Sequence, residues 1–453
     1  MVDSQHTQGF NIKYKEVAMG QVKEVKVAIL GLGNRGKNYG GHLANTPGVK
    51  IVAICDKYQE KIDKVKKAWG VPDEMCFTDE EKFFGLGKVA DTMVIATQDK
   101  DHYGHAMKAL KLKYNLMIEK PLSPDINQCL EMEEYARKQG CKVLVCHVLR
   151  YAHYYKRIKE IIDSGILGKI VLINHDEDVA YWHYCHSYVR GNWRREEDTS
   201  PLLLAKCCHD MDLMYWYAGS KCKSVSSYGS LNYFKPGNEP EGATDTCFDC
   251  PHKDTCNFEA TYQYIGRKKK LFGKEPKKYK WKPYAFCISN DPADILDKLK
   301  NDEKGKLWSR CVFKCDNNVV DCQTVNMEME NGVQIQMNVN AFNEHDHRHT
   351  EIRGSKGILI ADDSGSVLRL QLFGKKEKKI VVNLIPVIKG HFGGDQGVIA
   401  ATIDLVRGEL DPNGQYTWIQ DTIESHRIVT AAEMSRRDGG RKVELSEVPD
   451  IKA

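Results

Sequence analysis

The 453-residue sequence lacks any apolar stretch approaching the roughly 18 residues that a membrane-spanning helix needs. Its polar beginning, residues 1–21, has no apolar core of the kind that marks a secretory signal peptide. An excess of one charge sign is also missing, because 66 Lys and Arg stand against 62 Asp and Glu, so composition gives no argument for nucleic-acid binding. We therefore expect a cytoplasmic globular protein with neither a membrane nor a nucleic acid as partner.

Cysteine, by contrast, is abundant, with 16 residues. In a reducing cytoplasm most of them are expected to be free thiols, and metal ligation is the competing interpretation. A chain of this length can bury a full hydrophobic core without disulfides, and its length alone indicates two or three domains.

A glycine-rich motif follows the first predicted buried strand, Lys-Val-Ala-Ile-Leu. It reads Gly-Leu-Gly-Asn-Arg-Gly, and a helical pattern begins directly after it. In this setting Gly31 makes the tight turn, Gly33 lets the backbone approach a pyrophosphate, and Gly36 allows close helix–strand packing. The start of the helix then faces the phosphates, which predicts a dinucleotide site.

A second predicted strand, residues 50–55, ends in Asp56, which lies 20 residues after Gly36. A carboxylate there accepts hydrogen bonds from the adenosine ribose and repels a 2′-phosphate, so NAD is favoured over NADP, although Lys57 would soften that preference. Strands alternate with helices up to residue 147, which predicts a parallel, doubly wound sheet. The rest of the predicted cofactor site comes from the glycine loop and from loops at the carboxyl edge of the sheet: Asn34, Arg35, Thr97, His102, Glu119 and Lys120.

Further motifs follow in a fixed order along the chain. They are Ile-Ala-Thr at 95–97 with His102 beyond it, Glu-Lys-Pro at 119–121, and segments at 147–151, 161–168, 191–194, 209–213 and 390–395. Together with the glycine loop, over roughly residues 24–440, they resemble the Gfo/Idh/MocA family, which includes glucose–fructose oxidoreductase and inositol dehydrogenase.

The resemblance implies an α/β fold with two main parts. We expect an N-terminal extension at 1–23, an NAD-binding Rossmann domain at 24–150, and a C-terminal α/β domain at 151–453 with a large, mainly antiparallel sheet. The second domain is expected to bind substrate and to form dimers, tetramers or larger homo-oligomers. A cysteine- and lysine-rich insert at about 220–325 is the part least like the family.

Lys120 is the first candidate catalytic residue. Oxidising a secondary alcohol needs a group that takes the hydroxyl proton and a donor that stabilises the developing oxyanion. Lys120 stands at the tip of a predicted Rossmann strand, beside the expected nicotinamide, and Pro121 restricts its backbone. The competing interpretation is a surface lysine in a loop.

His209 and Lys206 are the next catalytic candidates. A helix predicted over 201–217 would place them on one face with Asp210, at spacings of three and four residues. Family members often carry an Asp four residues before this histidine, where Ala205 stands here. The basic pair would suit oxyanion stabilisation or an acidic substrate, and the alternatives are a core histidine and a solvated helix lysine.

Residues 181–190 are rich in aromatic side chains and histidines. Sugars stack their apolar faces on aromatic rings and offer their hydroxyls to polar side chains, so we expect the substrate here. The predicted substrate residues are Arg150, Tyr181, Trp182, His183, His186, Trp193, Arg194 and Asp210. His183 and His186 could instead ligate a metal, and the sequence leaves open whether His347 or His349 reaches the cleft from a predicted strand.

The insert contains the pattern C-x2-C-x5-C at Cys247, Cys250 and Cys256, and Cys311 or Cys315 further along the chain could supply a fourth ligand, with Cys311 taken as the candidate. Four thiolates at such spacing suit a tetrahedral structural zinc site, and a disulfide or packed free thiols are the alternatives. Residues 266–282 carry nine Lys and Arg, which indicates a solvated loop.

Three functions are consistent with these motifs. The first is an NAD-dependent dehydrogenase that oxidises a secondary hydroxyl of a sugar, glycoside or cyclitol, for example to a 3-keto sugar. The second is a redox-neutral glycosidase, in which transient oxidation acidifies the neighbouring C–H and the glycosidic bond leaves by elimination. The third is an NAD-binding sensor without catalysis, which Ala205 favours and which Lys120 and His209 oppose.

Overall fold

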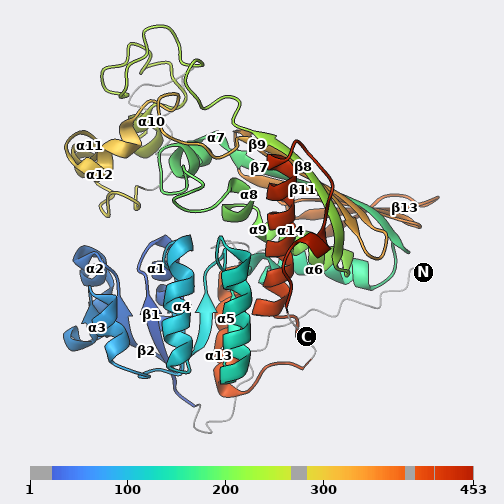
Figure 1. Cartoon of the computed structure of the whole chain (residues 1–453), viewed down its shortest axis with the longest axis horizontal. Helices are drawn as coiled ribbons and strands as arrows, with labels where there is room; N and C mark the ends of the chain where they lie inside the picture. Colours follow the sequence, from blue (N-terminus) through green and yellow to red (C-terminus); the bar gives the residue numbers. More distant parts are fainter. Residues whose placement is uncertain (1–22, 267–282, 383–392, 413, 452–453) are drawn as a thin grey trace, which may run out of the picture.

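The computed structural model describes residues 23–266, 283–382, 393–412 and 414–451 (Figure 1). Most of the predicted N-terminal extension, most of the lysine-rich segment 266–282, and residues 390–392 of the last family motif lie outside these ranges. Within the described part of the chain, no helix combines the length and the apolar character that crossing a bilayer requires.

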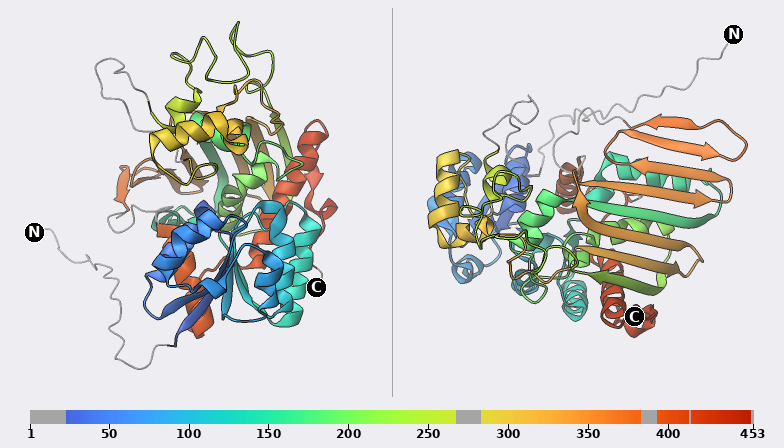
Figure 2. Two further views of the ribbon diagram at one scale, coloured as in Figure 1. Left: turned by 90° about the vertical axis from the view of Figure 1, so that its left-hand side faces the viewer. Right: turned by 90° about the horizontal axis from the view of Figure 1, so that it is seen from above.

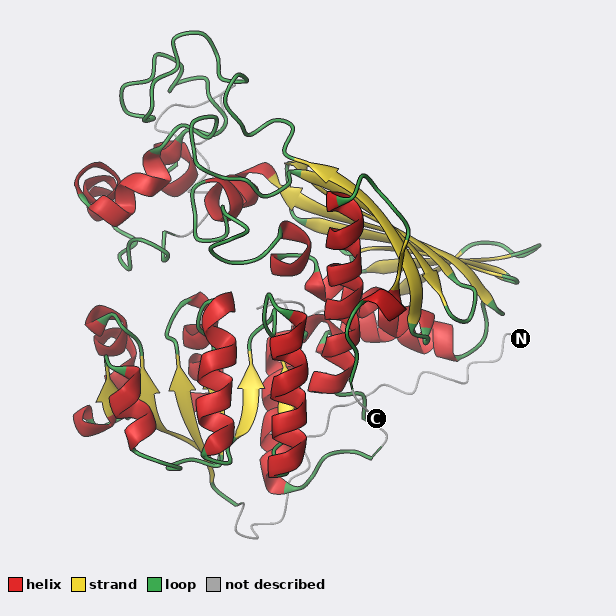
Figure 3. Cartoon of the chain, viewed as in Figure 1, coloured by secondary structure: helices red, strands yellow, loops and turns green. Residues whose placement is uncertain are grey.

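The N-terminal part is built on a six-stranded parallel sheet with the strand order β3-β2-β1-β4-β5-β6. The strands are β1 (Val25–Leu30), β2 (Val49–Cys55), β3 (Cys76–Phe77), β4 (Thr92–Ile95), β5 (Asn115–Ile118) and β6 (Val143–Val145). The helices between them are α1 (Asn34–Ala44), α2 (Gln59–Trp69), α3 (Glu80–Gly85), α4 (His102–Lys111) and α5 (Ile126–Gln139). The strands point toward the second half of the chain, so the carboxyl edge of the sheet faces it (Figure 3).

A helix from near the end of the chain completes this Rossmann sheet. Helix α13 (Gly394–Arg407) packs against α1 and β1. Its Val398 and Ile399 share one buried cluster with Val25 and Val27 of β1. Both faces of the sheet are therefore covered, which agrees with the nearly continuous apolar sequence of β1.

The C-terminal part is built on a nine-stranded sheet with the order β14-β13-β12-β11-β7-β10-β9-β8-β15. The strands are β7 (Ile170–Ala180), β8 (Cys222–Ser230), β9 (Cys322–Met329), β10 (Gln334–Asn343), β11 (His347–Gly354), β12 (Gly357–Asp362), β13 (Val367–Leu372), β14 (Lys378–Val381) and β15 (Val443–Glu444). Among the described strands of this sheet, only β7 and β10 pair in parallel. The predicted fold class, a Rossmann sheet followed by a large, mainly antiparallel sheet, is confirmed.

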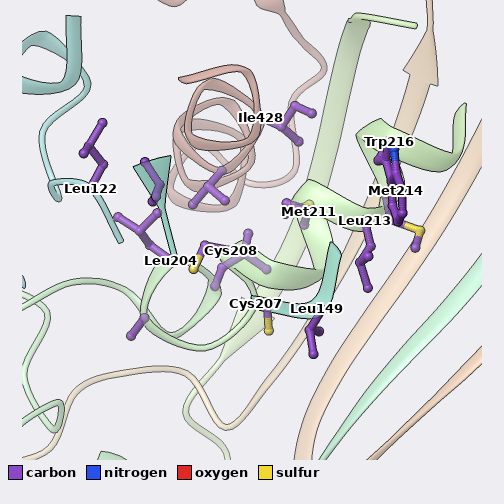
Figure 4. Packing of buried hydrophobic residues seen from close by; sticks show 14 of the residues in the cluster. Leu122, Leu149, Leu204, Cys207, Cys208, Met211, Leu213, Met214, Trp216 and Ile428 are labelled. Carbon is purple, nitrogen blue, oxygen red and sulfur yellow. The ribbon is translucent and has the colours of Figure 1, made fainter. Parts of the chain in front are cut away.

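Helices lie on one face of the nine-stranded sheet, and no helix of the described residues covers its other face, here called the open face (Figure 2). They include α6 (His153–Asp163), α9 (Cys208–Ala218) and α14 (Ile419–Arg437). The strands alternate accordingly, since in β10 and β12 every second residue is buried. Leu122, which follows β5, belongs to the same buried cluster as residues of α9 and Ile428 of α14, so this region joins the two parts (Figure 4).

The helix predicted over 201–217 is wrong as a single element. The chain forms two helices, α8 (Leu202–Ala205) and α9, with a break at Lys206 and Cys207. The carbonyl of Ala205 accepts a hydrogen bond from Lys120 Nζ at 2.6 Å. A tertiary contact thus takes an acceptor that an unbroken helix would use internally.

The two ends of the predicted insert, β8 and the start of β9, belong to the nine-stranded sheet, so the insert is the chain between these strands. It has a small hydrophobic core of its own. Its helices are α10 (Ala260–Tyr264), α11 (Pro292–Asn301) and α12 (Glu303–Lys306). The buried residues are Cys247, Ala260, Tyr264, Phe286, Cys287, Ile295, Leu299 and Trp308. The insert is therefore a packed unit, and Figure 1 shows α11 and α12 above the end of the Rossmann domain that carries α1 and α2.

Candidate active site

The glycine loop after β1 has the geometry of a dinucleotide site. Gly31 has φ +91°, and a Cβ there would lie 2.5 Å from the carbonyl oxygen of Ala96. A Cβ at Gly36 would lie 1.9 Å from the oxygen of Gly31, so neither position tolerates a side chain. A Cβ at Gly33 would meet nothing within 4 Å, which leaves open space where a pyrophosphate would approach.

The first turn of α1 and the end of β2 complete this half of the site. No side chain caps α1 at Gly33, so backbone N–H groups of its first turn are available to an anion. Asp56 accepts hydrogen bonds from the Leu32 N–H at 2.7 Å and the Tyr58 N–H at 3.0 Å. Lys61 Nζ lies 3.4 Å from the same carboxylate. These residues fit the adenosine and pyrophosphate of NAD.

Other predicted cofactor residues are engaged with protein groups. Arg35 Nε lies 2.8 Å from Glu119, and Arg35 Nη2 lies 2.7 Å from Asp395 on α13. His102 Nδ1 donates to the carbonyl of Pro121 at 2.7 Å. Because these contacts tie the loop after β5 to α1, α4 and α13, the residues stabilise the shape of the site.

Asn34 and Thr97 lie at the same edge of the sheet. Asn34 is exposed as the first residue of α1. Thr97 follows β4, and its hydroxyl is 3.0 Å from His105 Nδ1.

Lys120 is held at the junction of the two parts. Its Nζ donates to the Ala205 carbonyl, as described above, so the side chain reaches from the Rossmann sheet to the helix break before α9. The chain beyond it is fixed by His426 of α14, whose Nε2 accepts a hydrogen bond from the Leu122 N–H at 2.9 Å. The other nitrogen of that ring donates to the Thr422 carbonyl at 2.9 Å. The loop that carries Lys120 is therefore anchored at both ends.

His209 lies beside a second buried histidine. The ring centroids of His209 and His147 are 5.7 Å apart. Burial, with smaller contributions from Arg150 and Lys120, lowers the pKa of His147 to about 3, so the ring is neutral. Neither ring nitrogen of His147 has a hydrogen-bond partner among the described residues. The ring of His209 is therefore in edge-to-face contact with an uncharged histidine ring.

Lys206 belongs to a buried network of charged side chains. Lys206 Nζ is 2.8 Å from Glu177 on β7. Arg348 Nε on β11 is 2.8 Å from Glu177 and 2.6 Å from Asp210. Asp210 is also 3.0 Å from His175 Nε2. This network holds the predicted substrate residue Asp210 within the protein interior.

The two carboxyl groups of this network differ in acidity. Burial raises the pKa of Glu177 to about 7, against the opposing charges of Arg348 and Lys206. Burial alone would raise the pKa of Asp210 as well, but Arg348 and His175 hold it below its ordinary value. The site therefore contains one carboxyl group whose pKa is raised by burial and one whose pKa is lowered by its charged neighbours.

His183 belongs to the same neighbourhood. Its Nδ1 lies 2.9 Å from Asp346, which comes just before β11. Burial lowers the pKa of His183, and the charges of Lys206 and Lys120 lower it further. Asp346 in turn is among the groups that raise the pKa of Lys206 against its burial. The structure thus brings together Lys120, Lys206 and His183 from three separate stretches of sequence.

Trp193 reaches the Rossmann edge. Its Nε1 donates to the carboxylate of Asp99, 3.1 Å from both oxygens, in the loop after β4. The Ser200 hydroxyl donates to the same carboxylate at 2.7 Å. Asp99 was not among the predicted residues, and it connects the aromatic segment to the carboxyl edge of the sheet.

The remaining predicted substrate residues contact other protein groups. Arg150 forms a two-pronged pair with Asp212, at 2.7 and 2.6 Å. The other contacts are Trp182 Nε1 to the Glu344 carbonyl, His186 Nδ1 to the Tyr264 hydroxyl, Arg194 to Asp316, and the ring of Tyr181 against Phe258. His186 and Arg194 face the insert, since Tyr264 and Asp316 belong to it.

Glu177, Arg348 and Asp346 were not among the site residues predicted from the sequence. Strand periodicity is the signal that could have found Arg348, because alternate residues of β11 face opposite sides. Neither His347 nor His349 lies on the inner face: His347 Nε2 is 3.0 Å from Asp178, and His349 Nε2 is 3.5 Å from Glu351. The residue between them, Arg348, is the one that enters the buried network.

The four predicted zinc ligands, Cys247, Cys250, Cys256 and Cys311, line a single pocket in the insert. Among the described residues, no three His, Cys, Asp or Glu side chains already surround a common metal position. Arg190 also lines this pocket, is 1% exposed, and donates from Nη2 to the Cys247 sulfur at 3.4 Å. Its guanidinium otherwise contacts carbonyl groups and the Gln263 amide, and it forms no ion pair with a carboxylate in the described part of the chain.

Two family models match consecutive parts of the chain. The one described as an oxidoreductase family with an NAD-binding Rossmann fold matches residues 25–147. The one described as the C-terminal alpha/beta domain of the oxidoreductase family matches residues 159–445. Both carry the family name Gfo/Idh/MocA, so together they cover most of the sequence.

Individual proteins that resemble this chain share a low sequence identity with it. YteT of Bacillus subtilis is 23% identical over 390 residues, which are 81% of this chain and 84% of YteT. Inositol 2-dehydrogenase/D-chiro-inositol 3-dehydrogenase of Lactiplantibacillus plantarum is 26% identical over 222 residues, 48% of this chain and 57% of that enzyme. The crystal structure of the WlbA dehydrogenase of Bordetella pertussis, in complex with NADH and UDP-GlcNAcA, has a TM-score of 0.63 at 15% identity, covering 93% of this chain and 98% of WlbA.

Proposed function

The chain belongs to the Gfo/Idh/MocA family of NAD-binding oxidoreductases, and we propose that it oxidises a secondary hydroxyl of a sugar, glycoside or cyclitol with NAD. The observation that carries the proposal is the position of Lys120. Its Nζ lies at the carboxyl edge of the Rossmann sheet and contacts the Ala205 carbonyl in the break before His209. Lys120 is a group that can take or give a proton, and it lies between the glycine loop and the buried network of charges around Lys206.

The proposal assigns a role in the reaction to each group of this site. When bound, nicotinamide supplies the hydride acceptor. Lys120 takes the proton of the reacting hydroxyl, while His209 and Lys206 stabilise the developing oxyanion. Glu177 and Asp346 balance the charge of Lys206, so that the cation persists in a buried site. Trp193, fixed by Asp99, offers an apolar surface to a sugar ring.

The proposal is tested by absorbance at 340 nm with NAD and a panel of glucosides, galactosides, free hexoses and inositols. We expect NADH to form with one substrate class and the product to be two mass units lighter. Binding of NAD, measured by fluorescence, is the control. A chain that binds NAD and leaves every substrate intact would contradict the dehydrogenase and favour the sensor.

Glu177 favours a second candidate, the redox-neutral glycosidase. Glu177 lies 2.8 Å from the catalytic candidate Lys206, and burial raises the pKa of its carboxyl group, which favours a form that can donate a proton to a leaving group. In this route transient oxidation would be followed by loss of the neighbouring C–H proton. Reaction in D2O separates the two candidates: cleavage without NADH and with deuterium beside the oxidised carbon identifies the elimination route, and its absence excludes it.

We further propose that the four thiols of the insert bind a structural zinc ion. The spacing supports this, and so does Arg190, because a buried guanidinium without a carboxylate needs an anionic partner. A zinc centre with four thiolates carries net negative charge and would provide one.

Metal analysis of the purified protein tests the zinc proposal. We expect about one zinc per chain, with the four cysteines as tetrahedral ligands. Cys250→Ser should lose most of the metal and lower the melting temperature, whereas Cys322→Ser, at an exposed thiol on β9, should change neither. A metal-free protein after expression with added zinc would leave disulfide or free-thiol packing as the explanation.

The open face of the nine-stranded sheet supports the expectation of a homo-oligomer. It carries a regular row of polar contacts, including Asn338 to Asp176 and Asn340 to Asp178, both at 2.8 Å. We propose that a second copy of the chain covers this face. Sedimentation equilibrium should report at least a dimer, and a strictly monomeric species would contradict the proposal.

A further inference from the structure

One segment of the insert reaches back to the glycine loop of the Rossmann domain. This segment comprises residues 283–306 and includes α11 and α12. Within it, the Tyr284 hydroxyl donates to the Leu32 carbonyl at 3.4 Å. Lys37 Nζ of α1 lies 4.6 Å from the centroid of the Tyr284 ring. Tyr284 therefore touches both the phosphate-side loop and the helix that follows it.

Two more contacts connect the segment to α2 and to Tyr58, which lies between β2 and α2. Lys64 Nζ of α2 donates to the Ile288 carbonyl at 2.6 Å. Lys304 Nζ of α12 lies 4.6 Å from the centroid of the Tyr58 ring. Tyr58 stands two residues after Asp56, the carboxylate expected at the adenosine ribose. The contacts thus lie on the adenosine side of the site, and in the view from above the insert helices overlie the first helices of the Rossmann domain (Figure 2).

The position of Tyr284 is set by packing in the insert core. Two residues further on, Phe286 stacks on Trp308 with centroids 5.1 Å apart. Phe286 also meets Tyr264 edge-on at 5.0 Å. Because Phe286 and Cys287 are buried in this cluster, packing in the insert core holds Tyr284 against the Rossmann domain.

We propose that Tyr284 contacts the adenosine half of the bound dinucleotide and that segment 283–306 slows the release of the cofactor. The inference rests on the proposed use of NAD and adds a binding residue from outside the Rossmann domain. An aromatic ring beside a purine nucleoside provides stacking area with little conformational freedom to lose. Burial raises the pKa of Tyr284 to about 12, with Asp56 and Glu60 adding to the effect, which agrees with its closeness to the ribose carboxylate.

The charges around the segment suit the same ligand. Lysine ammonium groups lie near the two tyrosine rings, from Lys37 and Lys64 at Tyr284 and from Lys57, Lys61 and Lys304 at Tyr58. Positive charge here attracts a pyrophosphate. Departure of the cofactor would require the insert to separate from α1 and α2, so exchange is expected to be slow.

Ligand fragments test the proposal without any turnover. In Tyr284→Ala we expect the affinity for NAD+ and for ADP-ribose to fall about ten- to a hundredfold, as on removal of an aromatic anchor. The affinity for nicotinamide mononucleotide should be unchanged. Calorimetry measures the affinities, and stopped-flow fluorescence should show a faster dissociation of NADH.

Controls separate this inference from the proposed function. Tyr228→Ala, at an exposed tyrosine on β8, should bind every fragment as the wild type does. If Tyr284→Ala fails to fold, Lys64→Ser with Lys304→Ser removes two contacts of the segment and should accelerate NADH release. Unchanged NAD+ affinity and dissociation rate in a folded variant would overturn the inference alone. A wild-type protein that binds no NAD+ would instead overturn the proposed function.

Discussion

Lys120→Ala is expected to lower kcat/KM by about 10²- to 10⁴-fold, the range associated with losing a general acid–base group. The variant removes the Nζ atom that lies 2.6 Å from the Ala205 carbonyl at the junction of the two parts. It leaves the glycine loop and Asp56 intact, so NAD+ affinity should change little. Steady-state kinetics with the substrate identified by the 340 nm assay measures the effect.

Two further variants complete this experiment. Lys111→Ala removes an exposed lysine from the end of α4 and should retain full activity. Lys120→Arg keeps the positive charge but does not release a proton near neutral pH, so it should remain slow if proton transfer is the role of Lys120. Near wild-type turnover in Lys120→Ala would move that role to another residue, with His209 the next to replace.

Of the variants proposed, Arg348→Met should lower the free energy of unfolding most, by about 3–5 kcal/mol, because it leaves a buried charge without its partner. Arg348 lies 2.6 Å from Asp210 and 2.8 Å from Glu177, and both carboxyl groups are fully buried. Arg353→Met is the matched control on the same strand, since Arg353 is half-exposed and its pair with Glu351 contributes little. Thermal melting of both variants measures the difference.

The difference in stability between the wild type and Arg348→Met should depend on pH in a defined direction. In the wild type the pKa of Asp210 is held below its ordinary value, chiefly by Arg348 against burial. The resulting stability is present above the unfolded pKa of about 3.9 and is lost as the pH falls. Without Arg348 that contribution disappears, so the two proteins should differ most above about pH 5 and converge in acid. A difference that grows in acid would contradict the assignment.

A double variant provides a second check. Adding Asp210→Asn to Arg348→Met removes the uncompensated carboxylate and should restore part of the lost stability. No recovery would mean that the destabilisation of Arg348→Met comes from lost packing of the arginine chain.

Most of the features that could be predicted from the sequence belong to local motifs. The turn at Gly31 and the close approach at Gly36 depend on residues near each other in sequence, and the structure has both. Asp56 follows β2, while its contact with the adenosine ribose stays a prediction. Lys120 at the end of β5 follows from the same logic, because the ends of parallel strands share one edge of the sheet.

The rest depends on contacts between distant parts of the chain. Glu177, Arg348 and Asp210 come from β7, β11 and α9, and no local pattern indicates that they meet. Periodicity also failed at Lys206, where the hydrogen bond from Lys120 to Ala205 accompanies a break in the expected helix. The contact of Tyr284 with Leu32 joins residues 252 positions apart, a separation at which sequence patterns give no information.

The placement of α13 has a consequence for how the chain is made. A ribosome releases the six strands of the first sheet long before residues 394–407 exist, yet Val398 and Ile399 belong to the cluster that buries Val25 and Val27. Until then one apolar face of the nascent domain stays uncovered, and such a face is a target for chaperones or for aggregation. The nucleotide domain of this protein is therefore finished among the last steps of synthesis, although its strands are the first to emerge.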